Sequence, residues 1–412
     1  MTLTYIWLAF FLLAFAVAFI KWAFLGDQQI LPALVEGIFK AANDGFDISL
    51  KLVGVMALFL GFMSIGEKAG AIRFLSRIVS PFFSKLFPDI PKNHPATGQM
   101  MMNFSANLLG LDNAATPFGI KAMQSLQELN PNKDTASNAQ IMFMALHASG
   151  LTLIPVSIIA MRASMKIPAA NPTDIFVPCM IVTFVATLAA LTIMSFKQKI
   201  NLLQPILLAW ILGLSALIGL LVWYLTTLDK ETLKLFSNTL SSGLILLIFL
   251  LFLLGGLRKK VNMFEAFVDG AKGGFEVAIR IIPYLIAMLI AISVLRNSGV
   301  FTYLIDGLRY LFGLTGMNTD FVEALPTALM KPLSGAGARG MMVTAMETYG
   351  TDSFIGRLSC IFQGTSDTTF YVIAVYFGAV SVKNTRYAIP AMLLADLVGI
   401  ITAIFVGYLF FH

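Results

Sequence analysis

The sequence predicts an all-α, polytopic transmembrane protein, and two observations carry this prediction. Hydrophobic residues make up 58% of the 412 residues and charged residues only 12%, with a mean hydropathy of +0.83. Soluble domains usually carry about a quarter charged residues. Five windows without Asp, Glu, Lys or Arg are long enough to cross a bilayer, which takes roughly 20 helical residues: 3–20, 141–161, 176–196, 203–228 and 239–257.

The pattern within these windows selects helices over a β-barrel. Each window is continuously apolar, whereas the strands of a membrane barrel alternate between apolar and polar residues. No Lys or Arg precedes the first window, and its apolar run is longer than the roughly 7 to 15 residues of a signal-peptide core. We therefore expect a retained first helix.

The basic residues lie between the windows. Lys197 and Lys199 follow one window, and the cluster 258–260 follows another. Cytoplasmic loops of membrane proteins are enriched in Lys and Arg, so the loops 197–201 and 258–262 are predicted on the cytoplasmic side and 229–231 outside. The net charge of +6 is explained by this pattern, and we expect the lipid bilayer as partner and no nucleic acid.

The chain contains an internal repeat, visible in two alignments of the sequence with itself. In the first alignment, DGFDISLKLVGVMALFLGFMSIGEKAG from Asp44 matches GGFEVAIRIIPYLIAMLIAISVLRNSG from Gly273 without a gap. In the second alignment, which lies further on and has a smaller spacing, 147–152 matches 363–368. A duplication of one helical unit explains both alignments.

The relative direction of the two copies stays open at this stage. Lys21 and the cluster 258–260 both place the start of a copy inside, which favours parallel repeats, whereas Arg73 and Arg77 follow the short window 52–66 and also prefer the inside. Either the window 52–66 enters the membrane without crossing it, or 71–86 is an amphipathic surface helix.

Polar residues gather where Gly and Pro interrupt both copies, within 110–119 and 332–340. Non-helical backbone is tolerated at membrane depth only where protein buries it or where it lines a water-filled cavity, and broken helices in matching positions mark transporter binding sites. We therefore expect a substrate-binding site lined by Asn103, Ser105, Asn107, Asp112, Asn113, Ser334, Gly335, Arg339, Gln363, Ser366, Asp367 and Thr368.

Structural roles compete with this interpretation. Polar side chains also pair across membrane helices, for about 1 kcal/mol or less each, and Ser366 or Asp367 can cap a helix that begins near 368. Asp367 would stay ionised only beside a cation such as Arg339 or Lys331. Asp396, alone in the last apolar span, fits a proton or cation site as well as an ion pair.

Two stretches resemble known families. MMMNFSANLLGLDNAATPFGIKAM, from Met100, resembles the signature of spore maturation protein A. LSGAGARGMM and YGTDSFIGRLSCIFQGTSDTTFYVIAVYFG resemble that of spore maturation protein B. Both belong to the nucleoside recognition, or Gate, domain family, which also covers parts of concentrative nucleoside transporters and of the ferrous iron transport protein B.

The resemblance implies two repeated Gate-type halves containing broken or re-entrant helices. These are a spore maturation protein A-like half at 1–200, with a core at about 44–162, and a B-like half at 201–412, with a core at about 273–380. It also implies a transporter-like or gate-like core, linked in spore formers to dehydration of the spore core. A nucleoside ligand does not follow from the domain name.

Catalytic and cofactor motifs give no support to an enzyme. Residues 335–340 satisfy the G-x-G-x-x-G pattern, but no strand precedes them, so the match is a chance one. A P-loop and the H-E-x-x-H and G-x-S-x-G motifs are absent from the sequence. With three histidines and two cysteines, Cys179 and Cys360, in the chain, we expect no metal, no cofactor and inert buried thiols.

The function predicted from the sequence is movement or gating of a small polar solute or ion. The site would lie between the two repeats of a multi-pass protein in a bacterial inner (cytoplasmic) membrane. The alternative is a non-transporting membrane scaffold that supports a partner complex, in which the polar motifs only hold helices together. The sequence leaves room for a homo-oligomer and does not identify the solute.

Overall fold

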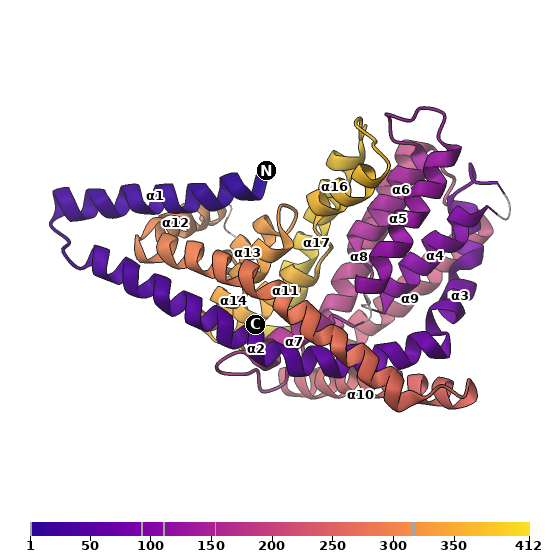
Figure 1. The fold of residues 1–412 in the computed structure, drawn as a ribbon, viewed down its shortest axis with the longest axis horizontal. Helices are drawn as coiled ribbons and strands as arrows, with labels where there is room; N and C mark the ends of the chain where they lie inside the picture. Colours follow the sequence, from indigo (N-terminus) through magenta and orange to yellow (C-terminus); the bar gives the residue numbers. More distant parts are fainter. Residues whose placement is uncertain (1, 92–93, 110–111, 153, 315, 317) are drawn as a thin grey trace. The chain divides into compact units, whose positions relative to one another are not determined.

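The computed structural model describes residues 2–91, 94–109, 112–152, 154–314, 316 and 318–412, and these residues are mostly helical (Figure 1). They contain no β-strand, only an isolated bridge between Thr135 and Asn384. The helices up to the middle of the chain are α1 (Thr2–Leu25), α2 (Ile30–Ala69), α3 (Ala71–Leu86), α4 (Pro95–Leu108), α5 (Asp112–Leu129), α6 (Asn138–Ser149), α7 (Val156–Ser164), α8 (Phe176–Gln198) and α9 (Pro205–Thr226).

The remaining helices follow in a related order. They are α10 (Lys230–Arg258), α11 (Met263–Asn297), α12 (Val300–Gly313), a 3-10 turn η1 (Val322–Ala324), α13 (Leu325–Met330), α14 (Gly335–Tyr349), α15 (Phe354–Gly364), α16 (Thr369–Ala379) and α17 (Ala388–Phe411).

Length and composition identify the candidate membrane spans among the described residues. Six helices qualify, namely α1, α2, α8, α9, α10 and α17, and the end of α11 (Leu285–Asn297) with α12, bent by 76°, counts as a seventh if the pair is one broken span. These helices confirm the prediction of an all-α polytopic membrane protein. They also confirm the predicted first helix and the run of three helices from α8 to α10.

One predicted span is wrong. The window 141–161 is not a single helix, because α6 ends at Ser149 and α7 begins only at Val156. Gly150 adopts a left-handed conformation with φ of +52°, which ends the helix, and Pro155 lacks the N–H that a continuous helix would use. In the first copy, Pro117 and Gly119 also lie inside α5 and do not interrupt it, contrary to the prediction, and Gly110 lies outside the described residues.

The two copies repeat the same succession of helices. The order from α2 to α8 recurs from α11 to α17, and the link between the first two helices of each copy contains a left-handed glycine, Gly70 with φ of +90° and Gly299 with φ of +86°. The hydroxyls of Ser137 and Ser353, which have the spacing of the second alignment, accept hydrogen bonds from the N–H groups of Gln140 and Gly356. These local features support the duplication.

The described chain forms two compact units that exchange helices between the copies. Unit 1 comprises residues 1–57, 157–172 and 273–363, and unit 2 comprises 58–156, 173–272 and 364–412. Unit 1 therefore combines α12 to α15 of the second copy with α7 of the first. Unit 2 combines α3 to α6 and α8 of the first copy with α16 and α17 of the second.

In both units, segments from different copies are joined by a contact between equivalent positions of the repeat. In unit 1 the Ala170 N–H donates to Asp352 Oδ2 at 2.8 Å. In unit 2 the Arg386 guanidinium donates to the carbonyl of Ala136 at 3.1 Å. The spacing of the second alignment carries Ala170 onto Arg386 and Ala136 onto Asp352. The two contacts therefore join equivalent positions with the roles of the copies exchanged.

Helices α2 and α11 pack closely in unit 1. A Cβ added at Gly45 would lie 3.0 Å from Ile286, and a Cβ added at Gly274 would lie 2.6 Å from the backbone of Ala57. The first alignment carries Gly45 onto Gly274 and Ala57 onto Ile286. This contact is therefore self-complementary, and the two equivalent helix segments run antiparallel.

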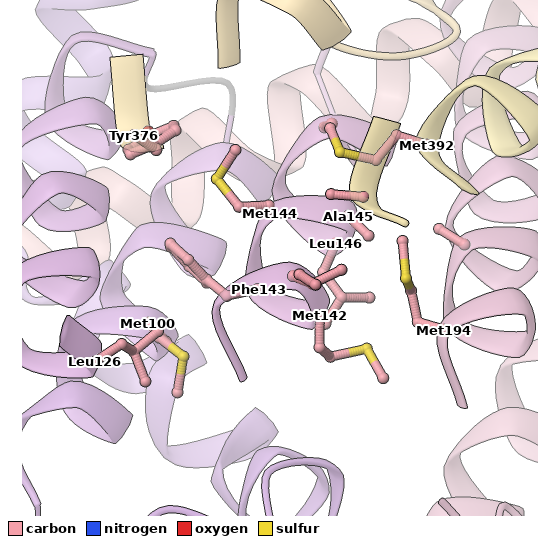
Figure 2. Close-up of a cluster of buried hydrophobic side chains, with 14 of the residues drawn as sticks. Met100, Leu126, Met142, Phe143, Met144, Ala145, Leu146, Met194, Tyr376 and Met392 are labelled. Carbon is pink, nitrogen blue, oxygen red and sulfur yellow. The ribbon is translucent and has the colours of Figure 1, made fainter. Parts of the chain in front are cut away.

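The core of unit 2 is rich in methionine. Figure 2 shows the side chains of Met142 and Met144 of α6 beside Phe143, with Met100, Met194 and Met392 contributed by neighbouring helices. The side chains of all six are buried. In Figure 1 the helices α4, α5, α6 and α8 of this unit lie side by side.

In unit 1 the glycine-rich stretch 335–340 serves helix packing. A Cβ at Gly337 would lie 2.6 Å from the side chain of Met330, and a Cβ at Gly340 would lie 2.9 Å from Met288. Only glycine permits this approach of α14 to α13 and α11. The agreement with the dinucleotide pattern therefore has a packing explanation.

Candidate functional site

A polar cluster around His147 forms inside unit 2. Asn103 and Asn107 are four positions apart on α4 and share one face of that helix. His147 lies in the last turn of α6, just before the left-handed Gly150 that ends the helix. Asp367 lies just before α16, where its backbone N–H donates to the carbonyl of Ala148 at 2.7 Å. The cluster therefore depends on two helix breaks, one in each copy.

The imidazole of His147 contacts polar groups on both sides. Its Nδ1 lies 3.0 Å from Asn103 Oδ1 and 2.7 Å from Asn107 Nδ2. Its Nε2 lies 3.6 Å from Asp367 Oδ2. Asn103 is held in place because its amide donates to the carbonyl of Ala115 at 2.7 Å, which directs its Oδ1 toward the ring.

This arrangement provides partners for His147 in more than one protonation state. An unprotonated Nδ1 accepts a hydrogen bond from the Asn107 amide. A protonated Nδ1 donates to Asn103 Oδ1. When both ring nitrogens carry a proton, the carboxylate of Asp367 faces the resulting positive charge. The site can therefore hold or release a proton without leaving the ring unpaired.

An aromatic wall closes one side of the imidazole. The ring of Tyr376, from α16, meets the His147 ring at a centroid distance of 4.8 Å and an interplanar angle of 80°. Gly119 of α5 makes room for it, because a Cβ at that position would collide with the Tyr376 ring. A glycine of the first copy thus positions an aromatic residue of the second copy against the site.

Burial changes sharply across the cluster. The His147 side chain is 5% exposed, whereas the Asp367 side chain is 45% exposed. The hydroxyl of Ser366, next to Asp367, is buried and has no hydrogen-bond partner among the described residues. A deeper carboxylate, Asp396, accepts a hydrogen bond from the Thr369 hydroxyl at 2.6 Å. The polar groups therefore lead from an accessible carboxylate to a buried ring.

Three further residues of the predicted site lie in unit 2, besides Asn103, Asn107 and Asp367. Ser105 is fully buried and its hydroxyl lies 3.2 Å from that of Ser76, so it joins α4 to α3. Ser366 and Thr368 are buried beside Asp367, and the Thr368 N–H donates to Asp367 Oδ1 at 2.7 Å. The side chains of Asp112 and Asn113 lie outside the described residues.

The remaining predicted residues belong to unit 1. Ser334 caps α14, because its hydroxyl accepts the N–H of Gly337 at 3.0 Å. Gly335 is the first residue of α14, and Arg339 is half-buried on the same helix. Gln363 is buried and its Oε1 has no hydrogen-bond partner among the described residues. A single site shared by all the predicted residues stays a prediction.

The sequence analysis did not place His147 in the site. A lone histidine in an apolar window is usually a paired core residue, and the sequence alone does not tell which side chains face it. One feature of the sequence could have indicated His147. The alignment of 147–152 with 363–368 pairs His147 with Gln363, which is itself a predicted site residue.

Comparison with known proteins identifies the family. The family model described as Gate, nucleoside recognition, matches residues 49–165 and 278–383. The chain belongs to the Gate family. The His147 cluster therefore combines residues of both Gate segments, since Asn103 and His147 lie in the first and Asp367 and Tyr376 in the second.

Two curated relatives agree with a fused Gate protein. Spore maturation protein B of Bacillus subtilis (strain 168) is 45% identical over 174 residues, which cover 42% of this chain and 96% of the relative. Spore maturation protein A of the same organism is 44% identical over 158 residues, which cover 38% of this chain and 80% of the relative. No solved structure matches the chain significantly.

Proposed function

We propose that this Gate protein moves a small polar solute or ion across the inner (cytoplasmic) membrane of a bacterium, or gates its passage, through the His147 cluster of unit 2. The observation that carries the proposal is a buried imidazole with partners for each protonation state, next to a carboxylate that is 45% exposed. Ionisable groups inside a membrane protein are expensive to bury and usually serve a pathway.

The chemistry of the cluster favours a cation, a proton or a solute rich in hydrogen-bond donors. The carboxylate of Asp367 and the carbonyl oxygen of Asn103 are acceptors, and the hydroxyl of Ser366 is an uncommitted group beside them. His147 adjusts the charge of the site by one unit when it takes up or releases a proton. A binding event can thereby be coupled to protonation.

The backbone supports a transporter-like arrangement. The links between α6 and α7 and between α15 and α16 interrupt helices near the cluster residues. Such breaks free backbone groups for ligands. The antiparallel packing of the equivalent α2 and α11 segments in unit 1 favours inverted over parallel repeats if both helices cross the bilayer.

A scaffold without transport is the second candidate, and specific contacts favour it. Ser105 pairs with Ser76, and Ser334 caps α14, so two residues of the predicted site already have structural partners. If the same holds for Asp367 and His147, their interaction serves only to join α16 to α6.

The deciding variant is Asp367→Asn, with Asp89→Asn as a matched control on an exposed loop of the same unit. Thermal unfolding of the purified protein with and without nucleosides and cations identifies a stabilising ligand, and flux into proteoliposomes then follows it. We expect Asp367→Asn to abolish ligand stabilisation and flux while the unfolding midpoint without ligand stays near that of the wild type. The amide keeps the shape of the carboxylate but removes its charge.

Two other results decide against transport at this site. A fall in the midpoint of Asp367→Asn that is restored by adding His147→Gln assigns the pair to structure and supports the scaffold. A stable Asp367→Asn protein with unchanged ligand response and flux contradicts both candidates and leaves the local hydrogen bond to the Thr368 N–H as the role of Asp367.

A further inference from the structure

Unit 1 contains a polar cavity that the His147 site does not explain. Its volume is about 430 Å³. Its walls come from 37–44 of α2, the loop 165–167, 289–297 of α11 and the segment 344–351 at the end of α14. A neighbouring cavity of about 290 Å³ shares four wall residues with it: Arg296, Asn297, Thr344 and Thr348.

Cations outnumber anions in the walls of the larger cavity. Lys40, Lys166 and Arg296 contribute three positive charges, and Asp44 and Glu347 contribute two carboxylates. Lys166 forms an ion pair with Asp44, and these two charges compensate each other. Lys40, Arg296 and Glu347 remain, so the cavity keeps an excess of one positive charge.

The two remaining cations have spare hydrogen-bond donors. Arg296 donates from Nη1 to the hydroxyl of Thr348 at 2.6 Å, and within the described residues it forms no ion pair. A guanidinium carries five N–H donors in a planar fork, so most of them are available. Lys40 makes no hydrogen bond or ion pair with the described residues and is exposed at the cavity wall.

Glu347 compensates these cations only partly. Burial by surrounding protein atoms raises the pKa of its carboxyl group, and the nearby negative charge of Asp44 raises it further. Lys166, Lys40 and Arg296 act in the opposite direction and more weakly. When Glu347 takes up a proton, the positive excess of the cavity grows from one charge to two.

The chemistry of the two cations indicates which kind of anion fits the cavity. Lys40 belongs to α2 and Arg296 to α11. The Thr348 hydroxyl of α14 donates to the Thr344 carbonyl at 2.7 Å and accepts from Arg296, so it holds the guanidinium in place and is not itself a free donor. A planar carboxylate offers two oxygens in one plane, whereas a phosphate group offers oxygens in tetrahedral directions and pairs well with an arginine fork. A guanidinium fork and an ammonium group from two different helices therefore suit the phosphate better.

We propose that the cavity of unit 1 binds a phosphate group between Arg296 and Lys40. The group belongs either to a small soluble phosphate compound or to the headgroup of an anionic lipid, since the chemistry of recognition is the same. This proposal uses only residues of unit 1 and does not rest on transport through the His147 cluster.

The test measures thermal unfolding of the full-length protein in detergent over a titration with inorganic phosphate. We expect saturable stabilisation of the wild type. Arg296→Gln and Lys40→Gln should each weaken the apparent affinity about tenfold or more, as expected when one charge-assisted hydrogen bond is lost. Arg296→Lys, which keeps the charge but not the fork, should fall between wild type and Arg296→Gln.

Matched controls separate the site from general charge effects. Lys51→Gln removes an exposed lysine from the same helix as Lys40 but outside the cavity, and His147→Gln removes the proposed transport site. Both variants should bind phosphate as the wild type does. A loss of phosphate binding in Lys51→Gln equal to that in Lys40→Gln would mean that net charge alone matters, which overturns the proposal.

Nanodiscs distinguish the two sources of the group. The site is assigned to a lipid headgroup if phosphatidylglycerol stabilises the wild-type protein more than phosphatidylcholine does and if this difference is lost in Arg296→Gln and Lys40→Gln. The site is assigned to a soluble compound if inorganic phosphate stabilises the wild type in detergent, if this stabilisation is lost in the same two variants, and if the two lipids give the same stability. If neither probe stabilises the wild type, or if both variants respond like the wild type, the cavity is not a phosphate site.

Discussion

Units 1 and 2 contain the same type of joint between the two copies, but they differ in how deeply its arginine is buried. In unit 1 the fully buried Arg162 donates to the Thr351 carbonyl at 3.0 Å and pairs with Asp352 at 3.2 Å. In unit 2 the exposed Arg386 donates to the Ala136 carbonyl and to Asn138 Oδ1. The joint connects equivalent segments in both units, but arginines at non-equivalent positions of the repeat supply its charge, because Arg162 aligns with Gly378 and Arg386 with Ala170.

A second difference follows the same division. The principal buried polar cluster of unit 2 is the one around His147, whose equivalent in the second copy is Gln363. Gln363 is buried in unit 1 and its Oε1 has no partner among the described residues. The two units therefore share contacts between equivalent segments but differ in their buried side chains. Unit 2 contains the ionisable His147 cluster, and unit 1 contains the buried Arg162.

Replacing the two arginines of the joints should give the largest contrast. Arg162→Met removes the donor to the carbonyls of Thr351 and Asn171, whereas Asp352 keeps Arg357 and the Ala170 N–H, so we expect a loss of about 2 to 4 kcal/mol in the free energy of unfolding. Arg386→Met should cost less than about 1 kcal/mol, because Arg386 is itself exposed and water can replace its hydrogen bonds. Reversible denaturation in detergent micelles measures both.

Equal losses for the two arginine variants would break the comparison. They would mean that burial does not decide the contribution of these side chains. A loss below about 1 kcal/mol for Arg162→Met would also show that the buried guanidinium offsets its own desolvation poorly, as some buried ion pairs do.

Gly119 and Gly98 offer a contrast of intermediate size inside unit 2. A Cβ at Gly119 would collide with the Tyr376 ring, whereas a Cβ at Gly98 meets nothing within 4 Å. Gly119→Ala should destabilise the protein by about 1 to 3 kcal/mol through overpacking and should weaken any ligand response that depends on His147. Gly98→Ala should leave stability unchanged or raise it by up to about 1 kcal/mol, because alanine favours the helix.

Thermal unfolding with and without the stabilising ligand checks both effects of the glycine variants. A Gly119→Ala protein as stable as the wild type would mean that Tyr376 moves away at little cost. The aromatic wall of the His147 site would then be a loose contact and not a positioning element.

Much of the helical fold could be predicted from the sequence, because hydropathy and internal repeats are local patterns. Continuous apolar windows predicted α8, α9 and α10, and the two internal alignments predicted the repeated order of helices. The window 141–161 failed because hydropathy does not register the backbone conformation of one residue. Gly150, with φ of +52°, and Pro155, just before Val156, separate an apolar span into α6 and α7.

The exchange of helices between the units was beyond sequence reasoning for a related reason. Apart from Arg162, α7 is apolar, and so is α16, so their hydropathy patterns are the same in an exchanged and an unexchanged fold. The candidate site illustrates the consequence. Asn103 and Asp367 were expected in a site, but their meeting at His147 depends on α16 of the second copy lying in unit 2.

The two capping serines provide the smallest and most local contrast. Ser137 accepts the N–H of Gln140 at 3.2 Å, and the Gln140 side chain in return accepts the Ser137 N–H at 2.8 Å. Ser353 accepts the N–H of Gly356 at 2.9 Å and donates to the Gly350 carbonyl at 2.8 Å. Glycine at 356 has no side chain that could return a bond, so the second helix start depends on Ser353 alone.

Alanine at each serine should therefore act unequally, although the two positions are equivalent in the repeat. Ser137→Ala loses one hydrogen bond but keeps the bond from its own N–H to Gln140, so we expect a cost of about 0.5 kcal/mol. Ser353→Ala loses both of its bonds and should cost about 1 to 2 kcal/mol. Denaturation midpoints of the two serine variants measure these losses. Gln140→Ala, alone and combined with Ser137→Ala, tests the reason given. Once the bond returned by Gln140 is gone, loss of the Ser137 hydroxyl should destabilise α6 as much as loss of the Ser353 hydroxyl destabilises α15. A larger loss of stability for Ser137→Ala than for Ser353→Ala would contradict this prediction. The start of α6 would then depend on the Ser137 hydroxyl, and the hydrogen bond from Gln140 to Gln127 would have no role in the cap.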